Sequence, residues 1–409
     1  MAYLRRHLDE RLAYVLRVHP ACLIEGIRGV GKTSTATRLA AATLRLDHPP
    51  TAATAASDPT AACSSLPAPV LIDEWQRVPT VWDAVRRMID EDRTPGGFIL
   101  SGSSRAAITA DVHAGAGRIL PMLLRPMTLS ERHGRVPAVA LADLAEHGIE
   151  AVRGARSVFS PAEQVAPTTE SGLPGNLGMT PADHQESLRS YLDLAVSRDL
   201  DDVAPGARNA RKLRRYVRAY GAAVATTADH ATIHRAADVA KATGETYHDL
   251  LDRLGVVEEL PGWSSNRFKR LTKRPKRHLV DPALAAADHY ETAAVLDGRR
   301  ARLGELFESV VVCQIRATAE ALGLGWRFGH LRSAGGDHEI DLIADLPDGG
   351  VLAFEAKLAP SAGIADARHL AVLKDRLGDA FRAGLVVHPG TVAFRLADRI
   401  AAVPLGVLV

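Results

Sequence analysis

Cysteine and long hydrophobic runs are the features this sequence has least of. The three cysteines, Cys22, Cys63 and Cys313, lie far apart and show none of the short spacings of a metal site. They predict reduced thiols, as in a cytoplasmic protein. No stretch approaches the ~20 apolar residues that a membrane-spanning helix needs. The charged start MAYLRRHLDERL is unlike a secretory signal. We therefore expect a cytoplasmic protein with no membrane partner.

The chain also has little net charge. Lys and Arg number 50 against 48 Asp and Glu, a formal balance of +2 that argues neither for nor against a nucleic-acid partner. The apolar content of 46% and charged content of 24% are those of a folded globular chain. At 409 residues the chain is too long for one ordinary core, so we expect two or three domains.

The first motif with specific chemistry is G-x-x-x-x-G-K-T at residues 26–33. Its glycines let the backbone curl so that N–H groups face phosphate oxygens, while Lys32 supplies charge and Thr33 a hydroxyl for Mg²⁺. An apolar run precedes the motif, and helical spacing over 34–46 follows it. A chance glycine turn is the alternative. The motif predicts an ATP site formed by Gly26, Ile27, Arg28, Gly29, Val30, Gly31, Lys32, Thr33 and Ser34.

Two further strand ends fit a hydrolytic site. The apolar run 69–72 ends in Asp73, expected to hold Mg²⁺ with Thr33, and Glu74, expected to polarise the attacking water. The run 97–100 ends in Ser101, which we expect, with Ser103 as second choice, to sense the terminal phosphate or orient water, because ligands bind beyond the carboxyl ends of parallel strands. The alternatives are an acidic helix cap and a serine turn.

Taken together, GIRGVGKTS, VLIDEWQRVP, FILSGSS and the segment from Gly117 to Glu131 resemble the compact AAA-type ATPases of bacteria and archaea. The resemblance implies an α/β multidomain protein, with a P-loop parallel αβα sheet followed by a C-terminal region of unknown function. It also makes Arg118 a candidate phosphate sensor in cis or finger in trans, with Arg28 and Arg125 as further candidates. A surface salt bridge is the alternative for each arginine. The oligomeric state stays open, a homo-oligomer included.

Composition divides the rest of the chain. The segment 47–69, rich in Ala, Thr, Pro and Ser, is expected to be a mobile insertion. Residues 234–260 have the order helix, turn at Gly244, helix, strand that is typical of a winged helix, with a structural or protein-docking use as the alternative. The expected parts are an ATPase domain at 1–135, a linker at 136–184, a helical and winged-helix region at 185–290 and a C-terminal domain at 291–409.

A basic segment follows the winged-helix pattern. Residues 265–278 are half Lys and Arg, with Phe268 interleaved, which is typical of a surface that attracts phosphate and stacks bases. A solvated hairpin is the alternative. The predicted DNA contacts are Arg267, Lys269, Arg270, Lys273, Arg274, Lys276 and Arg277.

The C-terminal pattern resembles the PD-(D/E)xK nuclease core. Asp341 and the triplet Glu355-Ala-Lys357 lie on successive expected strands, and Glu308 lies on a preceding helix. Strand alternation puts Glu355 and Lys357 on one face, so the carboxylates can hold Mg²⁺ while the lysine activates a water. Solvent-facing edge residues are the alternative. Such a domain can also keep the pattern without cutting.

Two functions are consistent with these patterns. The first is an ATP-hydrolysing protein that binds or processes DNA, with Mg²⁺-dependent nuclease activity left undecided. The second is a nucleotide-switched regulatory or scaffold ATPase whose nuclease-like domain is an inactive interaction module. The first is favoured because the residues of both expected sites are present together.

Overall fold

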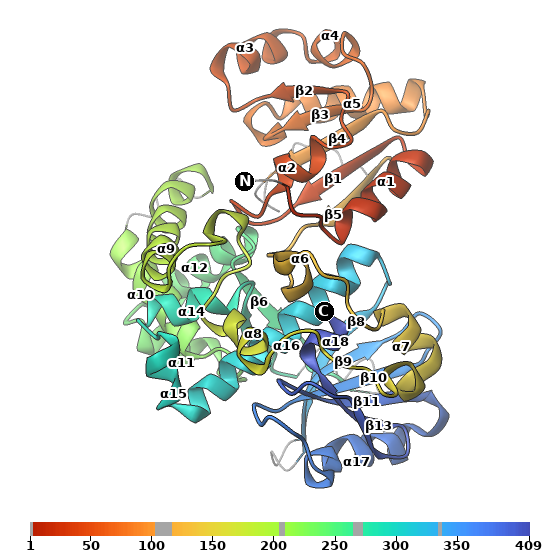
Figure 1. The fold of residues 1–409 in the computed structure, drawn as a ribbon. Helices are drawn as coiled ribbons and strands as arrows, with labels where there is room; N and C mark the ends of the chain where they lie inside the picture. The colour runs from red at the N-terminus through yellow and green to blue at the C-terminus, as the bar shows by residue number, and fades with distance from the viewer. Residues whose placement is uncertain (1–2, 103–116, 204–208, 265–272, 334–337) are drawn as a thin grey trace.

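The computed structural model describes residues 3–102, 117–203, 209–264, 273–333 and 338–409. Figure 1 shows an α/β sheet at one end of the molecule, a group of helices beside it and a second sheet at the other end. The α/β multidomain architecture is therefore confirmed. Among the described helices, none combines the length and the apolar character needed to cross a membrane.

The first sheet is wholly parallel, with strand order β2-β3-β4-β1-β5. Because parallel strands all end at the same edge, the carboxyl ends of β1, β3 and β4 lie side by side. Helices α1, α2 and α5 accompany the strands. The bounds are α1 Leu8–Val18, β1 Ala21–Glu25, α2 Lys32–Ala36, β2 Ala42–Arg45, β3 Val70–Asp73, α5 Thr80–Glu91, β4 Phe98–Gly102 and β5 Ile119–Leu123.

Two expectations for this domain are wrong. The helix after the phosphate loop ends at Ala36 instead of continuing to residue 46, because residues 42–45 pair with β3 as edge strand β2 and bury Leu44. The segment 47–69 is not a mobile loop, since it forms α3 (Pro49–Ser57) and α4 (Pro59–Ser64). Alanine favours helix and each helix has proline in its first turn, where no backbone N–H is needed.

The middle of the molecule is helical and ends in a β-hairpin. Helices α11 and α12 precede the antiparallel pair of β6 and β7, which is the element order expected of a winged helix. The expected turn at Gly244 is wrong, because that residue lies inside α12. A Cβ there would stand 2.3 Å from Cδ2 of His234, so helix packing requires the glycine. The bounds are α9 Pro181–Val203, α10 Ala210–Ala222, α11 His230–Ala236, α12 Lys241–Arg253, β6 Val257–Leu260, β7 Lys276–Leu279 and α14 Pro282–Asp288.

The second sheet is mixed, with order β12-β13-β11-β10-β9-β8. Strands β9 and β10 are antiparallel, whereas β10 and β11 are parallel and joined through α17. The long helix α16 precedes the sheet and buries most of its length (Figure 1). The bounds are α15 Ala293–Asp297, α16 Arg300–Leu322, β8 Arg327–Arg332, β9 Glu339–Asp345, β10 Val351–Ala356, α17 Arg368–Leu377, β11 Phe381–His388, β12 Phe394–Ala397, β13 Ile400–Pro404 and α18 Leu405–Leu408.

The expected linker is folded against this second sheet. It contains the short helices α7 (Leu141–His147) and α8 (Pro161–Val165), and α6 (Leu129–His133) precedes it within the expected ATPase domain. Gln164 is fully buried and donates from Nε2 to the carbonyl of Gly390 at 2.8 Å. The interpretation of residues 136–184 as a simple linker is therefore wrong for the part up to α8, which packs against the core of the C-terminal domain.

Candidate nucleotide site and acidic centre

The phosphate loop follows β1 and leads into α2. A Cβ on Gly26 would stand 2.2 Å from the carbonyl oxygen of Leu124, so only glycine fits there. Gly31 has φ of +103°, a conformation that favours glycine, and it caps α2. Within the loop Ile27 and Val30 are buried, whereas the side chain of Arg28, like Ser34 on α2, is exposed. The strand, loop and helix expected around the motif are thus in place.

Lys32 rests on the loop itself. Its ammonium group donates to the carbonyls of Gly26 at 2.8 Å and Ile27 at 3.1 Å, and the residue is 6% exposed. Burial lowers the pKa of Lys32 to about 8, although Glu74 and Asp73 partly oppose that shift. The charge is therefore held by neutral carbonyls, which a phosphate oxygen can replace as a stronger partner.

Asp73 and Thr33, which were expected to hold a cation together, are in contact. The Thr33 hydroxyl lies 2.9 and 3.1 Å from the two carboxylate oxygens of Asp73, and Ser101 donates to the same carboxylate. The strand register explains the contact, because Asp73 on β3 pairs with Ser101 on β4. Hydroxyl and carboxylate oxygens suit Mg²⁺, so Thr33 and Asp73 fit the ion that would neutralise phosphate charge beside them.

Glu74 lies at the same edge, immediately after β3. Its backbone is left-handed, with φ 55° and ψ 46°, a conformation that is costly for a residue other than glycine. Its carboxylate accepts a hydrogen bond from Gln76. The turn holds Glu74 next to Asp73, where the general base was expected. Ser103, the second choice for a phosphate sensor, lies outside the described residues.

Of the arginines predicted for this site, Arg28 lies in the phosphate loop, whereas Arg118 and Arg125 are held in ion pairs. Arg118 precedes β5 at the amino end of the sheet, ~15 Å from the phosphate-loop edge at ~3.3 Å per residue. It pairs with Asp90 on α5 at 2.6 Å, so the expected role in cis is wrong and a role in trans stays a prediction. Arg125 is buried and pairs with Glu258 on β6 and Glu320 on α16, the latter at 2.6 Å. It connects domains through these ion pairs, and it also lines a small pocket beside the phosphate loop together with Gly26 and Ile27. Its contact with phosphate stays a prediction.

Two arginines near the loop were not predicted. Arg6, just before α1, is buried and donates to the carbonyl of Val30 in the loop at 3.0 Å. The second is Arg253, which ends α12 and is exposed, and it lines the same small pocket together with Gly26, Ile27 and Gly255. The sequence contains no signal for this contact, because α12 lies more than two hundred residues after the loop and meets it only through domain packing.

The acidic residues predicted at the C-terminal end converge as expected. Asp341 on β9 accepts a hydrogen bond from the backbone N–H of Ala356 at 2.9 Å. On β10 the ammonium of Lys357 lies 2.8 Å from Glu355, which confirms that the two side chains share a face. Burial raises the pKa of Glu355 to about 8, with the negative charge of Asp341 as the second cause. Whether this centre binds metal stays a prediction.

An unexpected lysine fills this centre. Lys276 on β7 is fully buried, and its ammonium lies 2.7 Å from Glu308, 2.7 Å from Glu339 and 3.1 Å from Asp341. Burial alone would lower the pKa of Lys276, but the three carboxylates outweigh it and raise that pKa. Burial also raises the pKa of Glu308. Neither this contact nor the involvement of Glu339 was predicted.

The described half of the basic segment is not a continuous basic surface. Lys276 and Arg277 were predicted to contact DNA, and this is wrong because both side chains are buried in ion pairs. Lys273 donates to the carbonyl of Trp263 at 2.9 Å, while the exposed Arg274 lies 3.4 Å from Asp229. Arg267, Lys269 and Arg270 lie outside the described residues.

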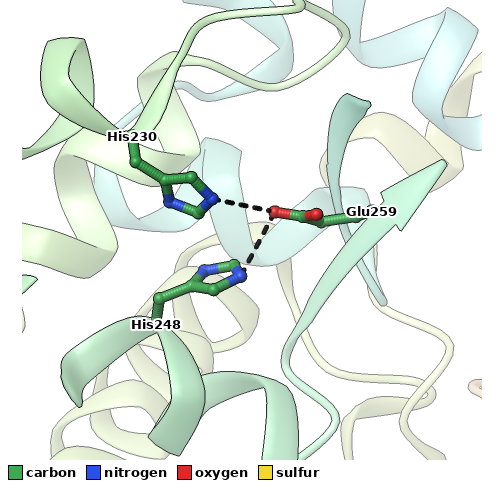
Figure 2. Close-up of side chains that lie close together, drawn as sticks. All are labelled: His230, His248 and Glu259. Carbon is green, nitrogen blue, oxygen red and sulfur yellow. Dashed lines mark ion pairs between the residues drawn. The ribbon is translucent and has the colours of Figure 1, made fainter. Parts of the chain in front are cut away.

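A second unpredicted cluster lies on the other side of β7. His230, His248 and Glu259 bring their donor atoms within 4.8 Å of one another (Figure 2). The Nε2 atoms lie 3.6 and 3.2 Å from one oxygen of Glu259, and such donors suit zinc. Arg277 pairs with that same oxygen, however. Burial, followed by the charge of Arg277, lowers the pKa of His230 to about 4. The carboxylate of Glu259 is therefore already paired with the guanidinium of Arg277.

Comparison with known proteins assigns the parts of the chain. Residues 18–133 match the model of an AAA domain, residues 172–289 a domain of unknown function (DUF8612), and residues 303–408 another (DUF4143). Uncharacterized proteins of Mycobacterium tuberculosis and Mycobacterium bovis are each 28% identical over an alignment of 409 positions, which covers 98% of this chain and 83% of the relative.

Solved structures of similar fold include two nucleotide-binding proteins. The Walker-type ATPase of Pyrococcus abyssi has a TM-score of 0.43 at 14% identity, covering 70% of this chain and 96% of that one. AMPPCP-bound DnaA from Aquifex aeolicus has a TM-score of 0.29 at 13% identity, covering 60% and 85%.

The fold and the phosphate loop define a P-loop ATPase domain of the AAA type, an ATP-binding class, at the N-terminal end of the chain. At the other end the chain has a DUF4143 domain.

Proposed function

We propose that the protein hydrolyses ATP at the carboxyl edge of its first sheet. The observation that supports this most directly is the contact of Thr33 and Ser101 with Asp73 beside the phosphate loop. Lys32 binds the outer phosphates, Thr33 and Asp73 hold Mg²⁺, and Ser101 orients the terminal phosphate or the water. Glu74 accepts the proton of the attacking water. The bound ion supplies neutralisation of phosphate charge.

The use of ATP in this proposal is to change contacts between domains, as in a nucleotide-switched ATPase. Leu124 packs its carbonyl against Gly26 of the loop, and the next residue, Arg125, is paired with Glu258 of the hairpin and Glu320 of α16. Arg316 also pairs with Glu258, at 2.9 Å. Buried charge-assisted bonds have few alternative partners, so movement of the loop on nucleotide binding is passed to both neighbours.

The test is nucleotide binding and hydrolysis by the full chain. Lys32→Ala is expected to abolish binding of a fluorescent ATP analogue, while the exposed Lys241→Ala serves as the matched control. Hydrogen exchange at residues 257–260 is expected to change when wild type binds ATP and to stay constant in Lys32→Ala. Unchanged ATP turnover in Lys32→Ala would remove the assignment. Unchanged exchange would remove the switch and leave hydrolysis standing.

DNA binding through the basic segment is a second candidate function. It is supported by the density of Lys and Arg over 265–278 and by the exposed side chain of Arg274. Phosphate contacts make affinity fall steeply with salt. The ATPase rate with single- or double-stranded DNA, and DNA affinity at low and high salt, test it. If neutralising Arg267, Lys269, Arg270 and Arg274 together leaves affinity unchanged, the segment is not the site.

A further inference from the structure

The acidic centre of the second sheet contains a cation supplied by another part of the chain. Glu308 comes from α16, and Glu339 and Asp341 come from β9. The ammonium of Lys276, which all three carboxylates face within 3.1 Å, comes from strand β7 of the hairpin. The lysine is fully buried, so the contact is part of the packed interior where hairpin and second sheet meet.

The nuclease resemblance implies Mg²⁺ at this place, and the residues do not fit it. The carboxylate oxygens are donors that Mg²⁺ accepts, at about 2.0–2.1 Å. The oxygens of Glu308 and Asp341 expected to bind the ion are instead in contact with Lys276. An ion bound to those oxygens would lie against a buried ammonium of the same sign. Magnesium and Lys276 therefore exclude one another at this centre.

The remaining charges near the centre are balanced in the same way. Lys357 pairs with one oxygen of Glu355 at 2.8 Å. The second oxygen of Glu355 is buried and has no hydrogen-bond partner among the described residues. Arg277, the next residue on β7, points to the opposite face and pairs with Glu259. Lys276 and Arg277, which are consecutive on β7, thus pair with carboxylates on opposite faces, because side chains alternate along a strand.

We propose that the acidic centre is a socket for the ammonium of Lys276, which takes the place of a divalent cation and fixes the hairpin to the second sheet. The C-terminal domain then acts as a docking module and not as a metal-dependent nuclease while β7 is in place. If β7 withdraws, the same carboxylates, with the free oxygen of Glu355, form a latent site for a divalent cation. This inference does not depend on ATP hydrolysis.

The test uses Mn²⁺ as the probe, titrated into the full chain without nucleotide and followed by electron paramagnetic resonance. Wild type and Asp341→Asn are expected to give the same weak binding, because Asp341 is already occupied. Lys276→Met keeps an unbranched side chain that is one atom shorter but removes the charge, and is expected to gain one site at least tenfold tighter. Lys276→Met combined with Asp341→Asn is expected to lose it. Lys273→Met, in the same segment, is the control.

The outcomes separate the alternatives. Binding of Mn²⁺ by wild type that Asp341→Asn abolishes would overturn the proposal, because the centre would then hold metal with Lys276 present. A folded Lys276→Met protein that gains no site would also overturn it. Should Lys276→Met fail to fold, the comparison of wild type with Asp341→Asn still decides, since equal binding supports the socket and unequal binding contradicts it.

Discussion

Two buried lysines of this protein have opposite surroundings. Lys32 in the phosphate loop is held by two backbone carbonyls, whereas Lys276 in the second sheet is held by three carboxylates. Burial lowers the pKa of the first, and carboxylate charge raises the pKa of the second. The neutral carbonyls around Lys32 leave its positive charge available for an anionic ligand. The carboxylates around Lys276 neutralise its charge instead.

The carboxylates of the two regions differ in the same sense. Asp73 is satisfied by the hydroxyls of Thr33 and Ser101, which can remain ligands or neighbours when a cation arrives. Asp341 is satisfied by an ammonium, which cannot. The same residue types therefore form an open site in the AAA domain and a closed one in the C-terminal domain. This contrast supports ATP turnover in the first region and docking in the second.

The largest effect is expected on ATP turnover, when the proposed general base of the open site is removed. Glu74→Gln removes the proposed base but keeps the shape of the side chain, so ATP should still bind while turnover falls by about 10²–10⁴-fold. The control is Glu91→Gln, the same chemical change on the exposed end of α5. Steady-state phosphate release and equilibrium binding of an ATP analogue measure the two quantities. Normal turnover in Glu74→Gln would show that another group accepts the proton.

A smaller effect is expected from separating the two regions. Arg125→Met removes the buried partner that Glu258 and Glu320 share and leaves both with Arg316. Loss of one member of a buried pair costs about 3 kcal/mol when the other charge is left alone, and we expect a loss approaching that size because Arg316 replaces only part of the pairing. Arg153→Met, whose side chain is 85% exposed and lies 3.7 Å from Glu150, should cost less than about 0.5 kcal/mol. Urea unfolding at pH 7 compares them. Equal stabilities would mean that Arg125 does not connect the domains energetically.

The smallest expected effect is a change in how the free energy of unfolding depends on pH, and it concerns the closed region. His278 on β7 is buried, and burial, then Lys276, lowers its pKa to about 3. The unfolded chain takes up this proton near pH 6.5 and the folded chain does not, so its contribution is complete above that pH and is lost as pH falls toward 3. At pH 5 the loss is about 2 kcal/mol.

His278→Gln is the variant for this measurement, because glutamine does not titrate. The difference in free energy of unfolding between pH 7 and pH 5 should be about 2 kcal/mol smaller for the variant than for wild type. His147→Gln, on the exposed surface, provides the control. An equal pH dependence of wild type and His278→Gln would mean that His278 is protonated in the folded state.

Sequence reasoning succeeded where the chemistry is local. The spacing of the phosphate loop and the carboxylates that end β3 correctly identified one edge of the first sheet. Strand alternation correctly placed Glu355 and Lys357 on one face. It failed where an outcome depends on distant packing. Arg118 lies at the wrong end of its strand, and residues 42–45 became a strand because β3 lies beside them.

Lys276 shows the limit most clearly. In the sequence it belongs to a run of basic residues, which predicts an exposed phosphate-binding surface. Its burial follows from the docking of the hairpin on carboxylates 32 to 65 residues later, a contact that no local pattern encodes. The sequence does not single out Glu339 for the same reason, since only its position beside Lys276 gives it a role.

The contrast between the open and the closed site is tested most directly by the number of Mn²⁺ ions bound per chain. Native mass spectrometry counts these ions on the wild-type protein with and without a non-hydrolysable ATP analogue. The open site requires nucleotide to complete its ligands, and the closed site is filled by Lys276. We therefore predict one ion per chain with the analogue and none without it. An ion that binds without nucleotide and disappears in Asp341→Asn would contradict the account.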